Sequence, residues 1–210
     1  MKNKILIFLF CLSIVLLSSL YAQNNSIKQD YYPLNTGSWW SYKVVETGEE
    51  FLIKVTDVKK FNGIDCYRVV TEIGGKPVLA DYILKTPEGV FQIGSSYFKN
   101  NKEITSIIYN PYKKILHVPL RIEDTWFYTG KETDAAHSVQ TRKAIKVEEV
   151  KAPAGTFETV RVNISTVNDG DAEKISNKVS WYAEGVGTVK ALARTLQGPR
   201  NIVLTKYFIK

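Results

Sequence analysis

Cysteine and histidine are scarce in this chain of 210 residues, which contains two of each. A zinc site needs three or four such ligands close together, and neither His117 nor His137 has a cysteine or an acidic pair at ligand spacing. We therefore expect no metal and no cofactor. A disulfide scaffold is excluded as well, because Cys11 lies in the apolar N-terminal segment and leaves Cys66 alone. We expect Cys66 to be a small buried side chain, and a disulfide-linked dimer is the alternative.

The chain also lacks the motifs of the common enzyme classes. No G-x-S-x-G nucleophile elbow occurs, and Gly185-Val186-Gly187 has no third glycine to complete a dinucleotide loop. The adjacent acids Glu49-Glu50 and Glu148-Glu149 would point to opposite faces of a strand, so neither pair converges on one atom of a substrate. We therefore expect a protein that is not an enzyme.

Long apolar runs are absent after residue 22, and the run before it has the layout of a secretory signal peptide. Lys2 and Lys4 precede apolar residues from Ile5 to Leu20, and Ala22 offers a small residue for cleavage. We expect a helical signal segment over 1–22, its removal, and a mature protein in the periplasm or outside the cell. A retained N-terminal anchor is the alternative, although the run of about 16 residues is shorter than the roughly 20 that span a bilayer.

Dense clusters of positive charge are missing too. The net charge of +7 falls to +5 when the two leader lysines are removed, and the remaining basic residues are spread along the chain. Such a surface is typical of a soluble protein with mixed charge. It also fits attraction to anionic lipid head groups or cell-wall polymers. With export expected, we predict no nucleic-acid partner and no membrane-spanning segment after cleavage.

After residue 30 the apolar residues follow the pattern of strands. Segments such as Phe51–Val55, Tyr67–Thr71 and Val160–Ile164 are short and rich in β-branched residues. Turn signals separate them at intervals of roughly ten residues, as in all-β sandwiches and barrels. The sequence therefore predicts an all-β, antiparallel fold.

One hairpin can be predicted in register. Asn62-Gly63 is typical of a two-residue turn, because both residues tolerate positive φ. Such a turn places Asp57 opposite Arg68 and Lys60 opposite Asp65, and opposite charges facing each other support that pairing. A three-residue loop would shift the register.

The two halves of the chain resemble each other, which predicts an internal duplication of a unit of about 90 residues. We place one unit at 23–114 and the second at 115–210, with about five strands each. A single copy would have an apolar face that it cannot cover, so we expect one fused domain, either a curved half-barrel or a two-sheet sandwich. The matches are Pro33-Leu34 and Trp40-Ser41-Tyr42 with Pro119-Leu120 and Trp126-Phe127-Tyr128, Ile53–Lys59 with Ile145–Lys151, Cys66–Val69 with Thr159–Val162, and Glu88–Val90 with Glu184–Val186.

Three segments resemble the signatures of a family of uncharacterised exported bacterial proteins and lipoproteins. Tyr32–Tyr42 is similar to Y-P-L-x-x-G-x-x-W-x-Y, Ala154–Phe157 to A-G-T-F, and Trp181–Gly187 to W-Y-A-x-G-V-G. The resemblance implies no activity. It implies a fold related to the curved antiparallel sheets of lipoprotein carriers. Unlike the lipoprotein members, this chain has no lipidated cysteine.

Aromatic residues gather in the matched segments, where alternate positions of a strand share a face. They either fill the core or line a concave apolar surface. We therefore predict an exported, non-enzymatic β protein that binds a hydrophobic or anionic envelope ligand, such as a lipid or glycan, on a curved aromatic surface. The alternative is a structural or adhesive module that binds other envelope proteins. The candidate ligand-binding residues are Trp40, Tyr42, Tyr97, Tyr109, Trp126, Tyr128 and Trp181.

Overall fold

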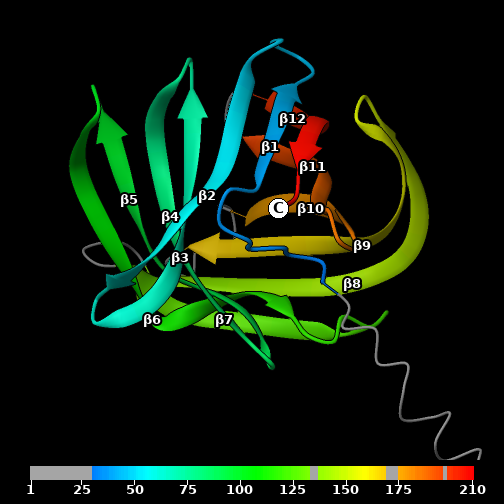
Figure 1. The fold of residues 1–210 in the computed structure, drawn as a ribbon. Helices are drawn as coiled ribbons and strands as arrows, with labels where there is room; N and C mark the ends of the chain where they lie inside the picture. Colours follow the sequence, from blue (N-terminus) through cyan, green and yellow to red (C-terminus); the bar gives the residue numbers. More distant parts are fainter. Residues whose placement is uncertain (1–29, 133–136, 169–174, 196–197) are drawn as a thin grey trace, which may run out of the picture.

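The computed structural model describes residues 30–132, 137–168, 175–195 and 198–210, which form twelve antiparallel strands in one closed barrel (Figure 1). Each strand pairs with its neighbours in sequence, and β12 returns to pair with β1. Within these ranges no helix is long and apolar enough to cross a membrane. The expected signal helix over 1–22 lies outside the described residues. The strands are β1 (Trp39–Val44), β2 (Glu50–Phe61), β3 (Ile64–Ile73), β4 (Lys76–Thr86), β5 (Gly89–Lys99), β6 (Lys102–His117), β7 (Thr125–Glu132), β8 (His137–Ala152), β9 (Gly155–Asn168), β10 (Ile175–Ala183), β11 (Gly187–Thr195) and β12 (Gly198–Phe208).

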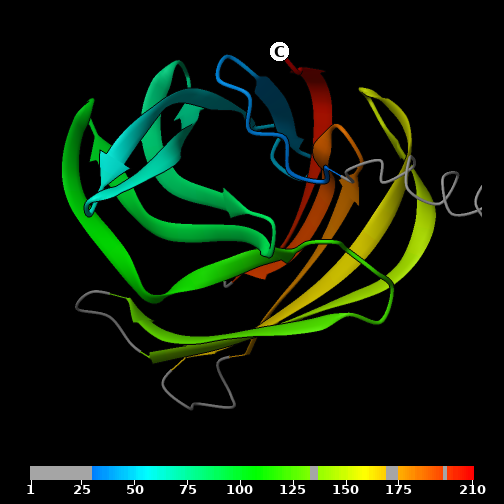
Figure 2. The same cartoon turned by 60° about the horizontal axis from the view of Figure 1, so that its bottom comes forward.

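The closed barrel confirms the all-β, antiparallel prediction and corrects the expected architecture. A half-barrel and a two-sheet sandwich are both wrong, because Trp40 of β1 pairs with Ile53 of β2 on one side and with Tyr207 of β12 on the other. Figure 2 shows the first and last strands, blue and red, lying side by side where the sheet meets itself. Closure gives the backbone groups of β1 and β12 partners, whereas a half-barrel would leave both strands as open edges.

The hairpin register predicted from Asn62-Gly63 is confirmed. Asp57 pairs with Arg68, and Lys60 pairs with Asp65. The Lys60 ammonium nitrogen lies 3.1 Å from Oδ1 of Asp65, although both side chains are mostly exposed and the pair contributes little to stability. Asn62 and Gly63 have φ angles of 49° and 80°, as a tight turn between twisted strands requires.

The ladder between β6 and β7 is short in the part of the chain that the structure describes. Among the described residues, these strands pair only at Tyr109–Glu132 and Asn110–Lys131. A Cβ atom at Gly130 would lie 2.6 Å from the Asn110 carbonyl oxygen, so the two backbones approach each other closely there. Pro111 has no N–H to donate to a ladder, and the rest of β6 diverges from β7.

The matched segments of the two halves fall on strands that are six places apart. The Pro-Leu…Trp-x-Tyr matches lead into β1 and β7, and the next matches lie in β2 and β8 and in β3 and β9. Trp40 and Trp126 are equally buried, at 6% exposed, as are Leu34 and Leu120 at 4%. The strand order is therefore compatible with duplication, which stays a prediction.

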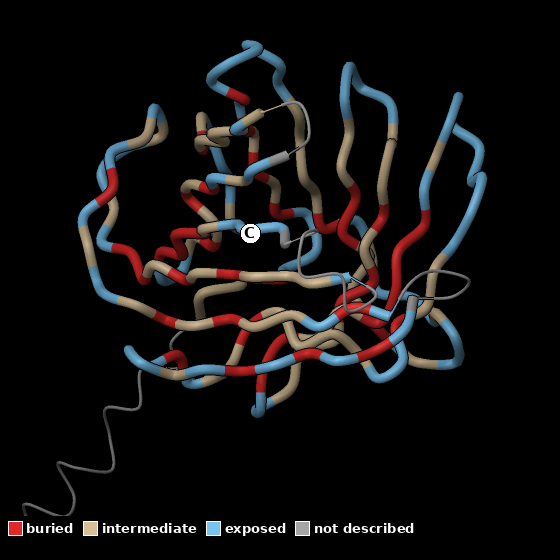
Figure 3. The backbone as a smooth tube through the Cα atoms, turned by 180° about the vertical axis from the view of Figure 1, so that it is seen from behind, coloured by how far each residue is buried: buried red, intermediate tan, exposed pale blue. Residues whose placement is uncertain are grey.

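Buried side chains form two clusters, and the exposed segments lie mainly at the hairpin tips (Figure 3). The larger cluster includes Trp40, Leu116 and Trp126. The smaller one surrounds Cys66, and in it the Phe61 ring stacks on the Tyr82 ring at 3.7 Å between centroids. Cys66 is 2% exposed, which confirms the prediction of a buried thiol, and burial raises its pKa.

Candidate functional site

A cavity of about 340 Å³ lies inside the barrel, which is within the 300–1,000 Å³ range usual for small-molecule sites. Eight strands and the segment before β1 contribute side chains to its wall. Apolar, phenolic and cationic groups are all present, and the described lining residues include no carboxylate. These residues are Tyr32, Tyr42, Phe51, Ile53, Gln92, Ile115, Arg142, Lys178, Tyr182, Thr188, Ala191 and Ile202.

The two cationic groups of the cavity come from neighbouring parts of the wall. Ile164 of β9 pairs with Arg142 of β8 on one side and with Lys178 of β10 on the other. Directly paired residues point to the same face of a sheet, so Arg142, Ile164 and Lys178 share one face. Arg142 and Lys178 both line the cavity, so this face points inward.

Arg142 is held in place by neutral oxygen atoms. Its Nε donates to Oε1 of Gln140 at 2.8 Å, and its Nη1 donates to the Ile115 carbonyl at 2.7 Å. The second bond links β8 to β6 across the boundary where β6 and β7 pair at only two described positions. Burial lowers the pKa of the guanidinium, against the raising effect of Tyr182 and Tyr32, but arginine stays charged in proteins.

Lys178 lines the cavity and keeps more than a third of its surface accessible to solvent. Its side chain therefore points into open space rather than into packed protein. Its ammonium forms no hydrogen bond and no ion pair with any described residue. Burial and the nearby Arg142 lower the pKa of Lys178, while Asp81 raises it.

Asp81 is the carboxylate that acts electrostatically on Lys178. It accepts its hydrogen bonds from neutral donors. Its Oδ1 accepts a hydrogen bond from Nε2 of Gln92 at 2.7 Å and another from Oγ of Ser95 at 2.6 Å. Burial raises the pKa of Asp81 in spite of these bonds and of the nearby Lys113 and Lys178. Asp81 therefore only partly offsets the positive charge of the interior.

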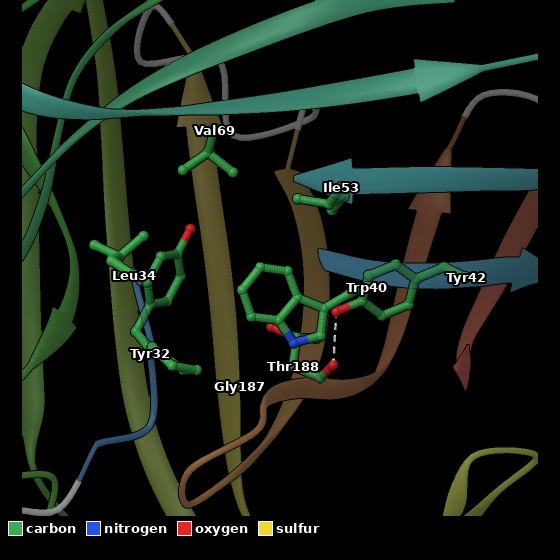
Figure 4. Close-up of a pocket in the computed structure, with 9 residues that line it drawn as sticks. Tyr32, Leu34, Trp40, Tyr42, Ile53, Val69, Gly187 and Thr188 are labelled. Carbon is green, nitrogen blue, oxygen red and sulfur yellow. Dashed lines mark hydrogen bonds between the residues drawn. The ribbon is translucent and has the colours of Figure 1, made fainter. Parts of the chain in front are cut away.

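Two buried phenols complete the inner wall. Burial raises the pKa of Tyr32 and of Tyr42 well above the usual value, so both remain protonated donors at neutral pH. Tyr42 Oη donates to the Thr188 carbonyl at 2.8 Å. Figure 4 shows this bond, with Tyr32 and Trp40 on opposite sides of a smaller pocket of about 70 Å³ that Leu34 and Val69 also line.

Tyr32 stands between the interior and one mouth of the barrel. It lines the inner cavity, the small pocket and a mouth groove of about 580 Å³ that contains Lys85, Pro87 and Val118. The segment that carries it is fixed by Lys85, whose Nζ donates to Oδ1 of Asp30 at 2.7 Å and to the Tyr32 carbonyl at 3.0 Å. A ligand that enters through this mouth would have to pass Tyr32.

The structure separates the aromatic residues that the sequence pointed to. Tyr42 lines the inner cavity, while Trp40 lines only the small pocket. Tyr97 is 40% exposed and lies far along β5 from the cavity residue Gln92. Trp126 is buried in the larger cluster.

The remaining three candidates lie in other environments. Tyr109 and Tyr128 are buried and meet edge to face at 6.2 Å, with the Lys113 ammonium 3.8 Å from the centre of the Tyr109 ring. Trp181 lies on the opposite face of β10 from Tyr182, because neighbouring residues of a strand alternate. Its ring has the Lys190 ammonium 5.1 Å from its centre, and its Nε1 donates to Glu148.

Sequence reasoning missed Arg142, Lys178, Tyr182 and Asp81. On β10, Lys178, Ser180 and Tyr182 share one face, while Val179 and Trp181 share the other. An aromatic residue stands on each face, so the pattern does not show which one turns inward. The sequence pattern that could have indicated the site is Lys178 on the same face of its strand as the buried Tyr182.

The described lining residues have the parts of a binding site. Within the described ranges, no group of three or more histidine, cysteine or acidic residues could hold a metal ion. Hydrogen-bond donors, cations and apolar surface together can hold a small ligand with a polar head.

Comparison with known proteins gives partial matches. Residues 125–193, from β7 to β11, are similar to the family described as DUF3108-like. Curated proteins give no match. A solved "putative lipoprotein" from Parabacteroides distasonis is 18% identical with a TM-score of 0.46, and a "putative exported protein with YmcC-like fold" from Bacteroides fragilis is 12% identical with a TM-score of 0.44. Each alignment covers 86% of this chain and 99% of the other.

Proposed function

We propose that this chain is an exported, non-enzymatic barrel protein that binds a small hydrophobic ligand in its interior. The observation that carries the proposal is the cavity of about 340 Å³ walled by Phe51, Ile53, Ile115 and Ile202 together with buried phenols. Export rests on the N-terminal sequence, where Lys2 and Lys4 precede an apolar run. The proposed ligand site is therefore the interior of the barrel, whereas the sequence predicted a curved aromatic-lined surface.

The size of the cavity limits the ligand. A water molecule takes up about 30 Å³ of liquid volume, so the cavity has room for about ten groups of that size. Compounds with an eight-carbon chain and a small head group have about that number of non-hydrogen atoms. Burying such a chain releases apolar surface from water at about 25 cal/mol per Å², which is the driving force for binding.

Octanol and octanoate are the probes that test this function. At least one of them should raise the melting temperature of the purified protein and change its tryptophan fluorescence, because Trp40 lies beside the cavity wall formed by Tyr42 and Ile53. Ala191→Leu should weaken binding at least tenfold, since Ala191 lines the cavity and the added carbons would occupy it.

Leu192→Phe is the matched control for Ala191→Leu. It adds bulk one residue further along β11, on the opposite face, where Leu192 is 38% exposed. The affinity of Leu192→Phe for octanol and octanoate should equal that of the unmodified protein. Failure of both probes to bind, or equal binding by Ala191→Leu, would contradict an interior site.

One observation favours a second candidate, a module that adheres to another envelope protein. Phe127 of β7 is 65% exposed, next to the strand boundary where β6 and β7 pair at only two described positions. Exposed apolar side chains beside an incompletely paired strand are typical of protein contact sites. Crosslinking in intact cells should then yield one stable partner, and Phe127→Ser should abolish that product while leaving octanoate binding intact.

A further inference from the structure

The inner cavity carries the positive charges of Arg142 and Lys178, which the nearby carboxylate of Asp81 offsets only in part. Arg142 and Lys178 line the cavity, and Arg142 donates hydrogen bonds to the neutral oxygen atoms of Gln140 and Ile115. Asp81 is the nearby carboxylate, and it is engaged by Gln92 and Ser95. Buried charges in proteins are ordinarily paired, because removing an ion from water is costly unless an opposite charge compensates it.

The two cations differ in what they do for the fold. Arg142 binds the Ile115 carbonyl and so helps to close the wall between β6 and β7. Lys178 makes no such bond with the described chain, although burial lowers its pKa. Lys178 lines the cavity together with a second cation and contributes no hydrogen bond or ion pair to the described part of the fold. Its position is explained if the opposite charge arrives with a ligand.

We propose that the cavity binds an aliphatic anion, with its carboxylate or phosphate head group between Arg142 and Lys178 and its chain along Phe51, Ile53 and Ile202. This inference rests on the proposed function and adds the chemical class of the ligand. Arginine suits the role because its planar guanidinium can offer two parallel N–H donors to such a head group. Lysine adds a compact charge on a flexible stem. Tyr182, beside Arg142, can supply a neutral donor from the same wall.

Four probes of similar size, with alkyl chains of six to eight carbons and different head groups, test the inference by calorimetric titration. Octanoate and hexyl phosphate should bind at least tenfold more tightly than octanol, and octylammonium should not bind. The ratio of octanoate to hexyl phosphate then shows whether the site suits a carboxylate or a phosphate. Equal affinities for octanol and octanoate would overturn the anion site while leaving an interior hydrophobic site standing. Failure of every probe would overturn both.

Lys178→Met tests the role of the lysine directly, because methionine approximates the length of the side chain and removes the charge. Octanoate affinity should fall at least tenfold, toward that of octanol, while the melting temperature of the unliganded protein stays the same or rises. Lys143→Met removes an equal charge from the outer face of β8, next to Arg142, and should leave octanoate affinity unchanged. An unaltered affinity in Lys178→Met, or a marked loss of its stability, would overturn the proposed role of Lys178.

Discussion

Gly94→Ala lowers the free energy of unfolding by about 3 kcal/mol, the upper end of what overpacking usually costs. A Cβ at Gly94 of β5 would press into the Ile107 carbonyl oxygen on β6 and lie 2.6 Å from the Phe61 ring. The carbonyl belongs to the paired strand and cannot turn away without breaking the ladder. Phe61 cannot move freely either, because its ring stacks on the buried Tyr82. Urea unfolding followed by tryptophan fluorescence would measure the loss.

Gly63→Ala is the control for Gly94→Ala. Its added Cβ would meet no atom within 4 Å, but its φ of +80° is strained for alanine. Its cost is that of the left-handed conformation alone, about 1–2 kcal/mol. A Gly94→Ala protein no less stable than Gly63→Ala would show that β5 and β6 are not packed as closely as the structure has them.

Trp40→Ala and Trp126→Ala each lower the free energy of unfolding by about 3–5 kcal/mol, as expected for a large buried aromatic side chain. Both indoles are 6% exposed within the larger cluster. Each occupies the same place in its half of the chain, six strands apart. Thermal or urea unfolding of the two variants should therefore show similar losses.

Phenylalanine at the same two positions separates packing from hydrogen bonding. Trp40 Nε1 donates to the Val186 carbonyl at 2.6 Å, whereas Trp126 Nε1 has no hydrogen-bond partner among the described residues. Trp40→Phe leaves a carbonyl without its donor, so it should cost about 1–2 kcal/mol more than Trp126→Phe. Equal costs would mean that the Val186 bond adds nothing to stability, and a larger cost for Trp126→Phe would mean that its indole N–H has a partner.

The sequence could predict only part of the candidate site. Tyr42 could be placed on a buried face because it alternates with Trp40 in a segment that recurs in the second half. Arg142 and Lys178 could not, because a charged residue on a strand ordinarily marks the solvent face. Whether such a residue faces water outside or a cavity inside depends on which way the whole sheet curves. No local pattern encodes that direction.

The sequence by itself determined the strand class, the antiparallel arrangement and the Asn62-Gly63 hairpin register, since each follows from alternation and turn chemistry within a few residues. Only the tertiary structure decided that the sheet closes, because β1 and β12 pair across almost the whole described chain. Closure in turn decided which face became the interior. It placed Arg142 and Lys178, which are 36 residues apart in the numbering, on one cavity wall with Ile164 between them. The physical reason is that a long-range strand pairing fixes the curvature of every strand at once, whereas propensity and alternation act on each strand alone.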